Sequence, residues 1–217
     1  SKLINRSGDP IKGEMVYRKL ELGCVSCHAI GGAGGKVGPD LTSIGASAPL
    51  DYLVESIYYP NRKIKEGYHS VVIETKNNQV LFGMLENQNE DEIFLRDVAN
   101  QRSTVLKRNI RKQTQGNSLM PSGLIDRLAK HLQSINLYSW GEPLLHKSLV
   151  DMIRHTAISH KIRTITSVHL GNLSDEQVEG LATSRLDKLI VSVDGATQEV
   201  YEKYRVGGNI EKVFTNM

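Results

Sequence analysis

The chain has 217 residues, of which 39% are hydrophobic and 24% are charged, as in an ordinary folded protein rather than a disordered one. The 27 Lys and Arg residues exceed the 24 Asp and Glu residues by three, a balance that does not favour nucleic acid as a partner. No apolar run approaches the roughly 20 residues of a membrane span. The length predicts one or two domains. The first residues lack an initiator Met and the apolar stretch of a signal peptide, so we expect either a chain from which a signal was removed or a fragment.

A short amphipathic helix is predicted to precede the two cysteines. Asp9 and Pro10 are the residue types of an N-cap and of a first helical position. Apolar residues then recur at helical spacing, at Ile11, Met15, Val16 and Leu20. This helix is expected to lead directly into the cysteine motif.

Cys24 and Cys27 are followed directly by His28, which is the spacing of c-type haem attachment. Two thiols on one turn of chain can add to the vinyl groups at one haem edge, and the adjacent imidazole can ligate iron. A thioredoxin-like dithiol and half of a zinc site are the alternatives. The dithiol is expected after a strand, and zinc needs more ligands than a chain with two cysteines offers in one cluster. The motif therefore predicts covalent haem c, with His28 as a metal ligand.

The next 90 residues alternate between helical and β patterns. The glycine-rich segment 31–35 is expected to wrap a haem edge, and a second helix is predicted from near Pro49 to before Pro60. Its apolar stripe consists of Leu50, Leu53, Val54, Ile57 and Tyr58. Alternating strands are predicted at 69–76, 79–86, 92–97 and 103–107, as a β insertion spanning residues 68–112.

Basic residues gather at the far end of the predicted insertion. They are Arg102, Lys107, Arg108, Arg111 and Lys112. A solvated rim and a docking patch for an acidic redox partner are both open interpretations. A last helix is predicted after Met120-Pro121, with Leu124, Ile125, Leu128, Leu132 and Ile135 on one face.

Residues 8–135 resemble the haem-binding cytochrome c domain of large dehydrogenase-like proteins of planctomycete and verrucomicrobial type. The matching segments are 24–28, 37–45, 52–57, 67–68 and 118–124. The resemblance implies that the carbonyl of Pro39 orients the imidazole of His28, and that Met120 is the sixth iron ligand. Core packing is the alternative role for Met120. It also implies a redox partner protein or a fused dehydrogenase domain, and a location in the periplasm or otherwise outside the bacterial cytoplasm.

From residue 137 the pattern changes to strands alternating with helices, which predicts parallel βαβ units. Apolar strands are predicted at 137–140, 163–170 and 189–193, the last of them buried. Helical patterns cover Leu145–Ala157, follow a capping box at Ser174–Gln177, and begin again at Thr197 and Asn209.

Residues 137–217 resemble the middle of a radical S-adenosylmethionine enzyme barrel, through segments 138–146 and 191–208. The resemblance implies that Glu142 would hold the methionine amino group, with Ser192 and Asp194 near the same ligand. The three-cysteine loop of that family is absent, because both cysteines belong to the haem motif. We therefore expect no iron–sulfur cluster and no S-adenosylmethionine chemistry. The segment is interpreted as a non-catalytic remnant, a truncated chain or an artificial join.

The sequence thus predicts an α+β protein: a helical class I-like cytochrome c with a small antiparallel β insertion, followed by a partial α/β segment. The expected function is single-electron transfer by a monohaem cytochrome with His28 and Met120 as axial ligands. The chain itself is expected to be an electron-transfer protein, or that domain of a larger oxidoreductase. The alternatives are a haem-dependent enzyme or sensor with an open sixth position, a partner-binding module, and a remnant that binds S-adenosylmethionine without chemistry.

Overall fold

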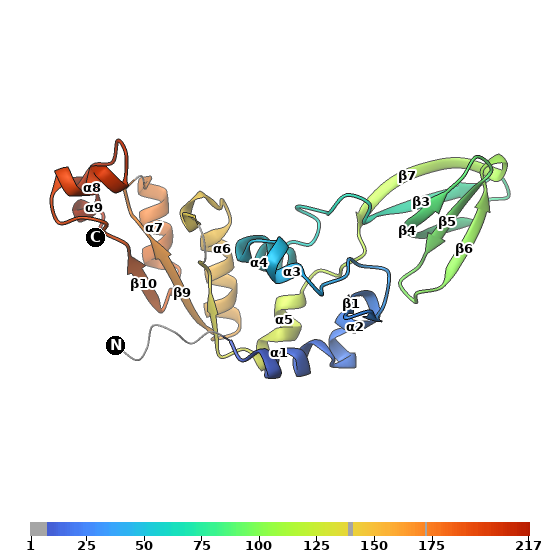
Figure 1. Cartoon of the computed structure of the whole chain (residues 1–217), viewed down its shortest axis with the longest axis horizontal. Coiled ribbons are helices and arrows are strands. Elements are labelled where there is room, and N and C mark those ends of the chain that lie inside the picture. Colours follow the sequence, from blue (N-terminus) through green and yellow to red (C-terminus); the bar gives the residue numbers. More distant parts are fainter. Residues whose placement is uncertain (1–7, 139–140, 172) are drawn as a thin grey trace. The chain divides into compact units, whose positions relative to one another are not determined.

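The computed structural model describes residues 8–138, 141–171 and 173–217 (Figure 1). Among these residues there are a five-stranded antiparallel sheet, a three-stranded parallel sheet and nine α-helices, so the α+β class is confirmed. The chain forms two compact units. One contains Ser1–Ala48 and Glu55–Arg127, and the other contains Pro49–Val54 and Leu128–Met217. In the described part of the chain, every helix is too short or too polar to cross a membrane.

Helix α1 (Pro10–Tyr17) begins where the capping residues predict. The Oδ1 atom of Asp9 accepts hydrogen bonds from the backbone N–H groups of Ile11 and Lys12, at 3.0 and 3.1 Å. No side chain of α1 is buried, and Ile11 and Met15 expose 74% and 66% of their surface. The helix therefore forms through its local signals, while its apolar side remains open.

Short elements follow α1. They are η1 (Leu20–Leu22), α2 (Cys24–Cys27), a hairpin of β1 (Ala29–Ile30) and β2 (Ala33–Gly34), α3 (Ile44–Ser47) and α4 (Leu50–Tyr58). Helix α4 ends before Pro60 as predicted. Its one buried residue is Glu55, whose carboxylate pairs with Arg62 at 3.3 Å and with Lys63 at 3.0 Å. Leu50 is exposed and the rest of the predicted stripe is only half-buried.

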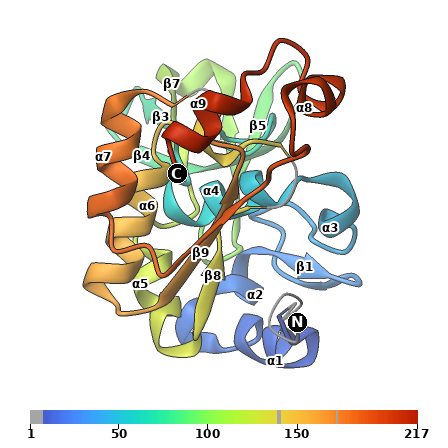
Figure 2. The same cartoon turned by 90° about the vertical axis from the view of Figure 1, so that its left-hand side faces the viewer.

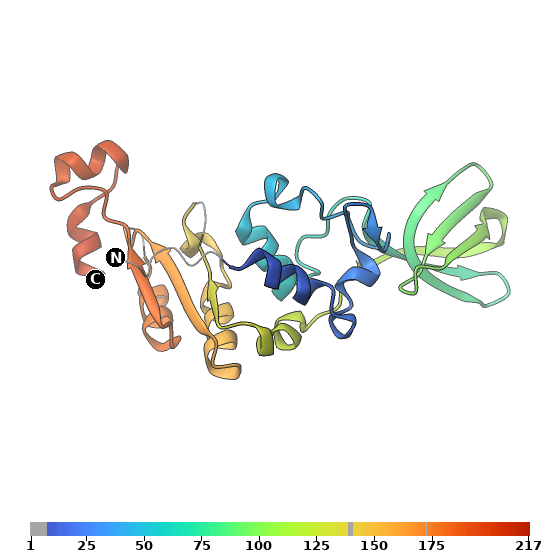
Figure 3. The same ribbon diagram turned by 60° about the horizontal axis from the view of Figure 1, so that its bottom comes forward.

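The antiparallel sheet contains β3 (His69–Thr75), β4 (Val80–Gln88), β5 (Glu92–Arg96), β6 (Arg102–Leu106) and β7 (Ile110–Ser118), in the order β6-β5-β4-β3-β7. The sheet is curled rather than flat (Figure 3). Val71, Ile73, Ile93, Leu95 and Val105 form its core. The four predicted strands are confirmed to within one or two residues.

Strand β7 was not predicted, and the sheet extends to Ser118 rather than ending at residue 112. The sequence Ile-Arg-Lys-Gln-Thr-Gln-Gly-Asn-Ser lacks alternating apolar residues, and most of the strand is exposed. It forms because its backbone pairs with β3, for example Thr114 with Val72. The turn η2 (Lys107–Asn109) returns the chain to that edge.

The predicted helix to residue 135 was wrong in its second half. Helix α5 covers Leu124–Leu128 only, and η3 (Ala129–His131) follows it. Ile135 lies instead in strand β8 (Ser134–Asn136), which starts before the predicted strand at 137–140. Residues 139–140 of that prediction lie outside the described residues. Leu132 and Ile135 are apolar at helical spacing. Residues 134–136 nevertheless form a strand, because their backbone pairs with β9.

The second unit is built on the parallel sheet β10-β9-β8, with β9 at Arg163–Val168 and β10 at Lys188–Val191. Its helical elements are η4 (Pro143–Leu145), α6 (Leu149–Arg154), the π-helical η5 (His155–Ser159), α7 (Asp175–Thr183), α8 (Gln198–Tyr204) and α9 (Ile210–Thr215). Helices α6 and α7 lie side by side against the sheet (Figure 2). Val150 of α6 contacts Gly180 of α7.

Local signals in the second unit are confirmed, whereas one burial prediction was wrong. Ser174 and Gln177 form both hydrogen bonds of the capping box, and Thr197 and Asn209 cap α8 and α9. The strand predicted as buried at 189–193 is not: Leu189 exposes 40% of its surface. It lies at the edge of the three-stranded sheet, where no fourth described strand covers it.

Candidate functional site

The two cysteines lie on a single helical turn. Helix α2 runs from Cys24 to Cys27, and the backbone N–H of His28 donates to the carbonyl of Cys24 at 2.9 Å. Both thiols are half-buried. Burial raises the pKa of Cys24, and burial together with the nearby Cys24 charge raises the pKa of Cys27. The two sulfurs are therefore neutral thiols at neutral pH, presented on neighbouring positions of one turn.

The imidazole of His28 is fixed by a backbone carbonyl. Its Nδ1 atom lies 2.8 Å from the carbonyl oxygen of Pro39. A carbonyl oxygen can only accept a hydrogen bond, so Nδ1 carries the proton. In a neutral ring this leaves Nε2 with its lone pair, and Nε2 makes no hydrogen bond within the described part of the chain. The ring is thus in the tautomer that can ligate a metal through Nε2.

Gly38 leaves space for the imidazole. A Cβ atom at this position would lie 2.5 Å from Cε1, 2.7 Å from Nδ1 and 2.9 Å from Nε2 of His28. All three distances are far below an ordinary contact, so no side chain larger than hydrogen fits unless the ring moves. Gly38 therefore allows the close approach of loop and ring on which the bond to Pro39 depends.

The loop that carries Gly38 is fastened to the cysteine turn. The N–H of Gly38 donates to the carbonyl of Cys27 at 2.7 Å, and the N–H of Gly35 donates to the carbonyl of Val25 at 2.9 Å. A Cβ atom at Gly35 would lie 1.9 Å from the carbonyl oxygen of Ser26. The end of the glycine-rich segment thus packs on residues 24–28, whereas residues 31–34 are exposed.

These residues fit a covalently bound haem. Two adjacent thiols, a neighbouring imidazole with a free Nε2 and a glycine cradle against its ring form one cluster within one unit. Exposed apolar side chains at Ile11, Met15 and Leu20 precede the cluster in the chain and can cover an apolar macrocycle. Cys24 and Cys27 would hold the group, and His28 would ligate its iron.

Met120 is half-buried in the segment between β7 and α5. Its backbone N–H donates to Oγ of Ser118 at 3.0 Å. The hydrogen bonds of the described residues do not connect Met120 with residues 24–28, so its role as sixth ligand stays a prediction.

The basic end of the β insertion is partly neutralised within the sheet. Arg111 pairs with Glu74 at 2.8 Å, and Arg102 pairs with Glu86 at 2.8 Å while its guanidinium lies over the ring of Phe94. Two of the five predicted basic side chains therefore have acidic partners within the same sheet. This favours a structural role for Arg102 and Arg111.

In the second unit, the carboxylate of Glu142 already accepts two backbone hydrogen bonds and has an imidazole beside it. Its Oε1 atom accepts from the N–H of Leu144 at 3.0 Å, and its Oε2 atom accepts from the N–H of His169 at 3.0 Å. The Nε2 atom of His169 lies 3.2 Å from the same Oε2. The Nδ1 atom of His169 accepts from the N–H of Gly171 at 3.0 Å, so Nε2, the nitrogen nearer Glu142, carries the proton.

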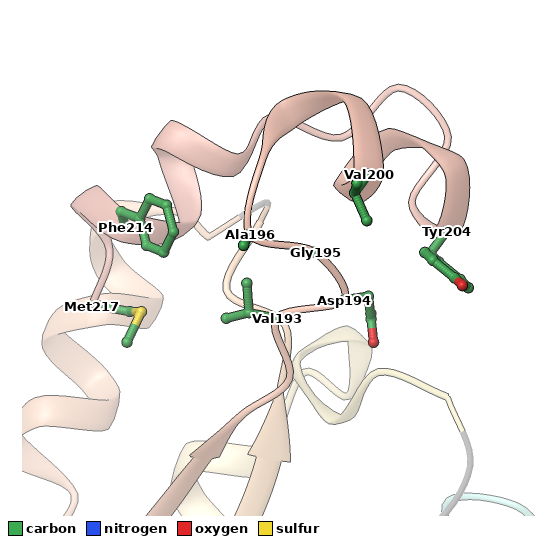
Figure 4. A pocket seen from close by; sticks show the side chains of 8 residues that line it. All are labelled: Val193, Asp194, Gly195, Ala196, Val200, Tyr204, Phe214 and Met217. Atoms are coloured by element: carbon green, nitrogen blue, oxygen red, sulfur yellow. The ribbon is translucent and has the colours of Figure 1, made fainter.

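The other two predicted residues of this unit lie after β10 and have partners of their own. Ser192 contacts the hydroxyl of Ser167 at 3.2 Å, and Asp194 accepts from Nε of Arg205 at 2.6 Å. Asp194 also lines an open, mainly apolar pocket with a volume of about 700 Å³ (Figure 4). The remaining lining residues are Val193, Gly195, Ala196, Val200, Tyr204, Phe214 and Met217.

Glu142, Ser192 and Asp194 follow the carboxyl ends of parallel strands, where ligands bind in open α/β sheets. However, the carboxylate of Glu142 already accepts from the N–H groups of Leu144 and His169, and the imidazole of His169 lies 3.2 Å from it. The chain also has no cysteines besides Cys24 and Cys27. The residues present therefore do not fit S-adenosylmethionine with an iron–sulfur cluster.

Comparison with known proteins gives one partial similarity. No family model matches the chain. The probable GTP 3',8-cyclase of Methanococcus maripaludis (strain C5 / ATCC BAA-1333) is 37% identical over 75 residues, which are 35% of this chain and 25% of that protein. The chain thus spans about a quarter of this relative's length. The similarity supports a partial, distant relation to radical S-adenosylmethionine proteins. The proposal of haem binding rests on the geometry of residues 17–39 alone.

Two functional contacts escaped the sequence reasoning. The phenol of Tyr17 donates to the backbone carbonyl of His28 at 2.7 Å, and burial raises the pKa of this phenol. The bond between His169 and Glu142 was also unforeseen. No spacing rule links residues 11 or 27 positions apart. The aromatic residue at the end of α1 was the one available signal.

Proposed function

We propose that this protein is a monohaem c-type cytochrome that transfers single electrons. The observation that carries the proposal is the hydrogen bond from Nδ1 of His28 to the carbonyl of Pro39. This bond leaves Nε2 available to iron, in the residue that directly follows a helical turn carrying two thiols. A dithiol oxidoreductase needs no such orientation of the neighbouring histidine.

The residues of the chain have separate tasks in this function. Cys24 and Cys27 anchor the group, so that it remains at the site through many turnovers. Pro39 fixes the orientation and the tautomer of the His28 ring through the Nδ1–H bond. When bound, haem supplies the one-electron redox chemistry of its iron. A redox partner or a fused dehydrogenase domain, and a location outside the bacterial cytoplasm, belong to the same proposal.

A visible spectrum of the chain produced with c-type maturation machinery tests the proposal. We expect a sharp low-spin spectrum in the reduced form, and haem that stays on the polypeptide after acid–organic extraction. The variant Cys27→Ala should lose one covalent link. Extractable haem, or no haem, in the unmodified chain would refute the proposal and favour the dithiol or zinc interpretation.

Met120 is proposed as the sixth ligand. Replacing it with Ala should open the sixth position, allow rapid carbon monoxide binding to the reduced protein and lower the reduction potential, because a thioether ligand favours ferrous iron. Met217→Ala is the matched control, since Met217 is exposed and belongs to the other unit. Rapid carbon monoxide binding to the unmodified protein would instead support a haem-dependent enzyme or sensor.

We also infer that the segment 137–217 is a non-catalytic relative of radical S-adenosylmethionine barrels. The hydrogen bonds that Glu142 already accepts from its own neighbours and the use of both cysteines in the haem motif support this inference. Calorimetry with S-adenosylmethionine tests it, and a measurable heat of binding would refute it.

A further inference from the structure

The carbonyl oxygen of His28 is covered by the β1–β2 hairpin and accepts a hydrogen bond from Tyr17. A Cβ atom at Gly34 would lie 2.1 Å from this oxygen, so the β1–β2 hairpin packs directly on it. The hydroxyl of Tyr17 donates to the same oxygen at 2.7 Å. A covered backbone carbonyl requires a hydrogen-bond partner, and the hairpin restricts access for water. Tyr17 provides that partner from the last residue of α1.

With this bond, His28 is held at three points. Its N–H is bonded to Cys24, its carbonyl to Tyr17 and its ring to Pro39. The first and third contacts come from within the motif and its loop, residues 24–39. The contact with Tyr17 is the one that ties the histidine to α1.

We propose that Tyr17 is a positioning residue for the axial histidine. Its hydroxyl fixes the peptide that follows His28, and thereby the direction in which the imidazole leaves the backbone towards Pro39. The role of His28 as an iron ligand rests on the proposed cytochrome function. The orienting contact itself belongs to the polypeptide and can be measured with or without haem.

The variant Tyr17→Phe tests this role, because it keeps the ring and removes only the hydroxyl. Proton exchange with water at Nδ1 of His28 is followed by NMR on the full-length ¹⁵N-labelled chain as purified and reduced. We expect exchange at Nδ1 to accelerate at least threefold, because the bond to Pro39 opens more often. Tyr204→Phe is the matched control: Tyr204 is exposed, and its hydroxyl makes no hydrogen bond among the described residues.

A general loss of stability has a different signature. The amide of Ile73, in the core of the antiparallel sheet, reports unfolding of that unit. We expect its exchange to be unchanged in Tyr17→Phe. Equal acceleration at Ile73 and at His28, or no acceleration at His28, would overturn the proposal. Absence of haem from the unmodified chain would refute the cytochrome function alone, because the exchange comparison can still be made on that chain.

Discussion

The contact between Gly38 and His28 allows a quantitative prediction. In Gly38→Ala, the new methyl group would lie 2.5 Å from Cε1 of the imidazole, whereas ordinary contact begins near 3.4 Å. The ring or the loop must therefore retreat by the difference, about 0.9 Å. A shift of that size along the bond to Pro39 would lengthen it from 2.8 Å to about 3.7 Å, where no hydrogen bond remains.

The energetic cost combines two effects. Overpacking costs about 1–3 kcal/mol, and the lost hydrogen bond adds about 1 kcal/mol. We therefore expect Gly38→Ala to lose about 2–4 kcal/mol of unfolding free energy in the haem-loaded protein. We also expect a reduction potential different from that of the unmodified protein, because the axial imidazole is no longer oriented by Pro39.

Denaturant unfolding and potentiometry measure the two effects on the same samples. Gly45→Ala is the matched control, because Gly45 lies in the short helix α3 and an added Cβ meets nothing within 4 Å. The control should unfold within about 1 kcal/mol of the unmodified protein. If Gly38→Ala matched Gly45→Ala in both unfolding and potential, the steric reasoning about the imidazole would be refuted.

Three further predictions concern the thiols, the second unit and the sheet. In chain made without haem, Cys24 and Cys27 should react with a disulfide reagent more slowly at pH 8 than an unperturbed thiol, because burial raises the pKa of both; a faster reaction would contradict this. S-adenosylmethionine should give no heat in calorimetry. His169→Ala removes the imidazole beside Glu142 but keeps the backbone bond to Oε2, so it distinguishes blocking by the imidazole from the absence of a site. The hydrogen bond from Arg96 holds the pKa of Glu86 below its ordinary value of 4.5. The pair therefore stabilises the folded sheet above pH 4.5, and this stabilisation is lost as the pH falls through the lowered pKa. Glu86→Gln should therefore reduce the difference in urea stability between pH 7 and pH 3 by up to about 1 kcal/mol, and an unchanged difference would contradict the assignment.

The sequence by itself determined the features that depend on near neighbours. Cys24, Cys27 and His28 lie within five residues, and helix α2 places the two cysteines on one turn. The caps at Asp9 and Ser174 formed as expected, because each bonds to an N–H two or three residues away. The first four strands of the antiparallel sheet followed from alternation, since their apolar face supplies the core.

Only the tertiary structure decided contacts between residues far apart in the chain. Strand β7 pairs with β3 through backbone groups, and its polar sequence has no alternating apolar residues that would predict a strand. Ile135 joined a parallel sheet although its spacing indicated a helix. Glu142 acquired His169 as a partner because β8 and β9 end at the same edge. Tyr17 reached the carbonyl of His28 because the β1–β2 hairpin covers that oxygen. Local patterns fix a residue's own conformation, whereas its distant partners depend on how the whole chain satisfies its buried polar groups.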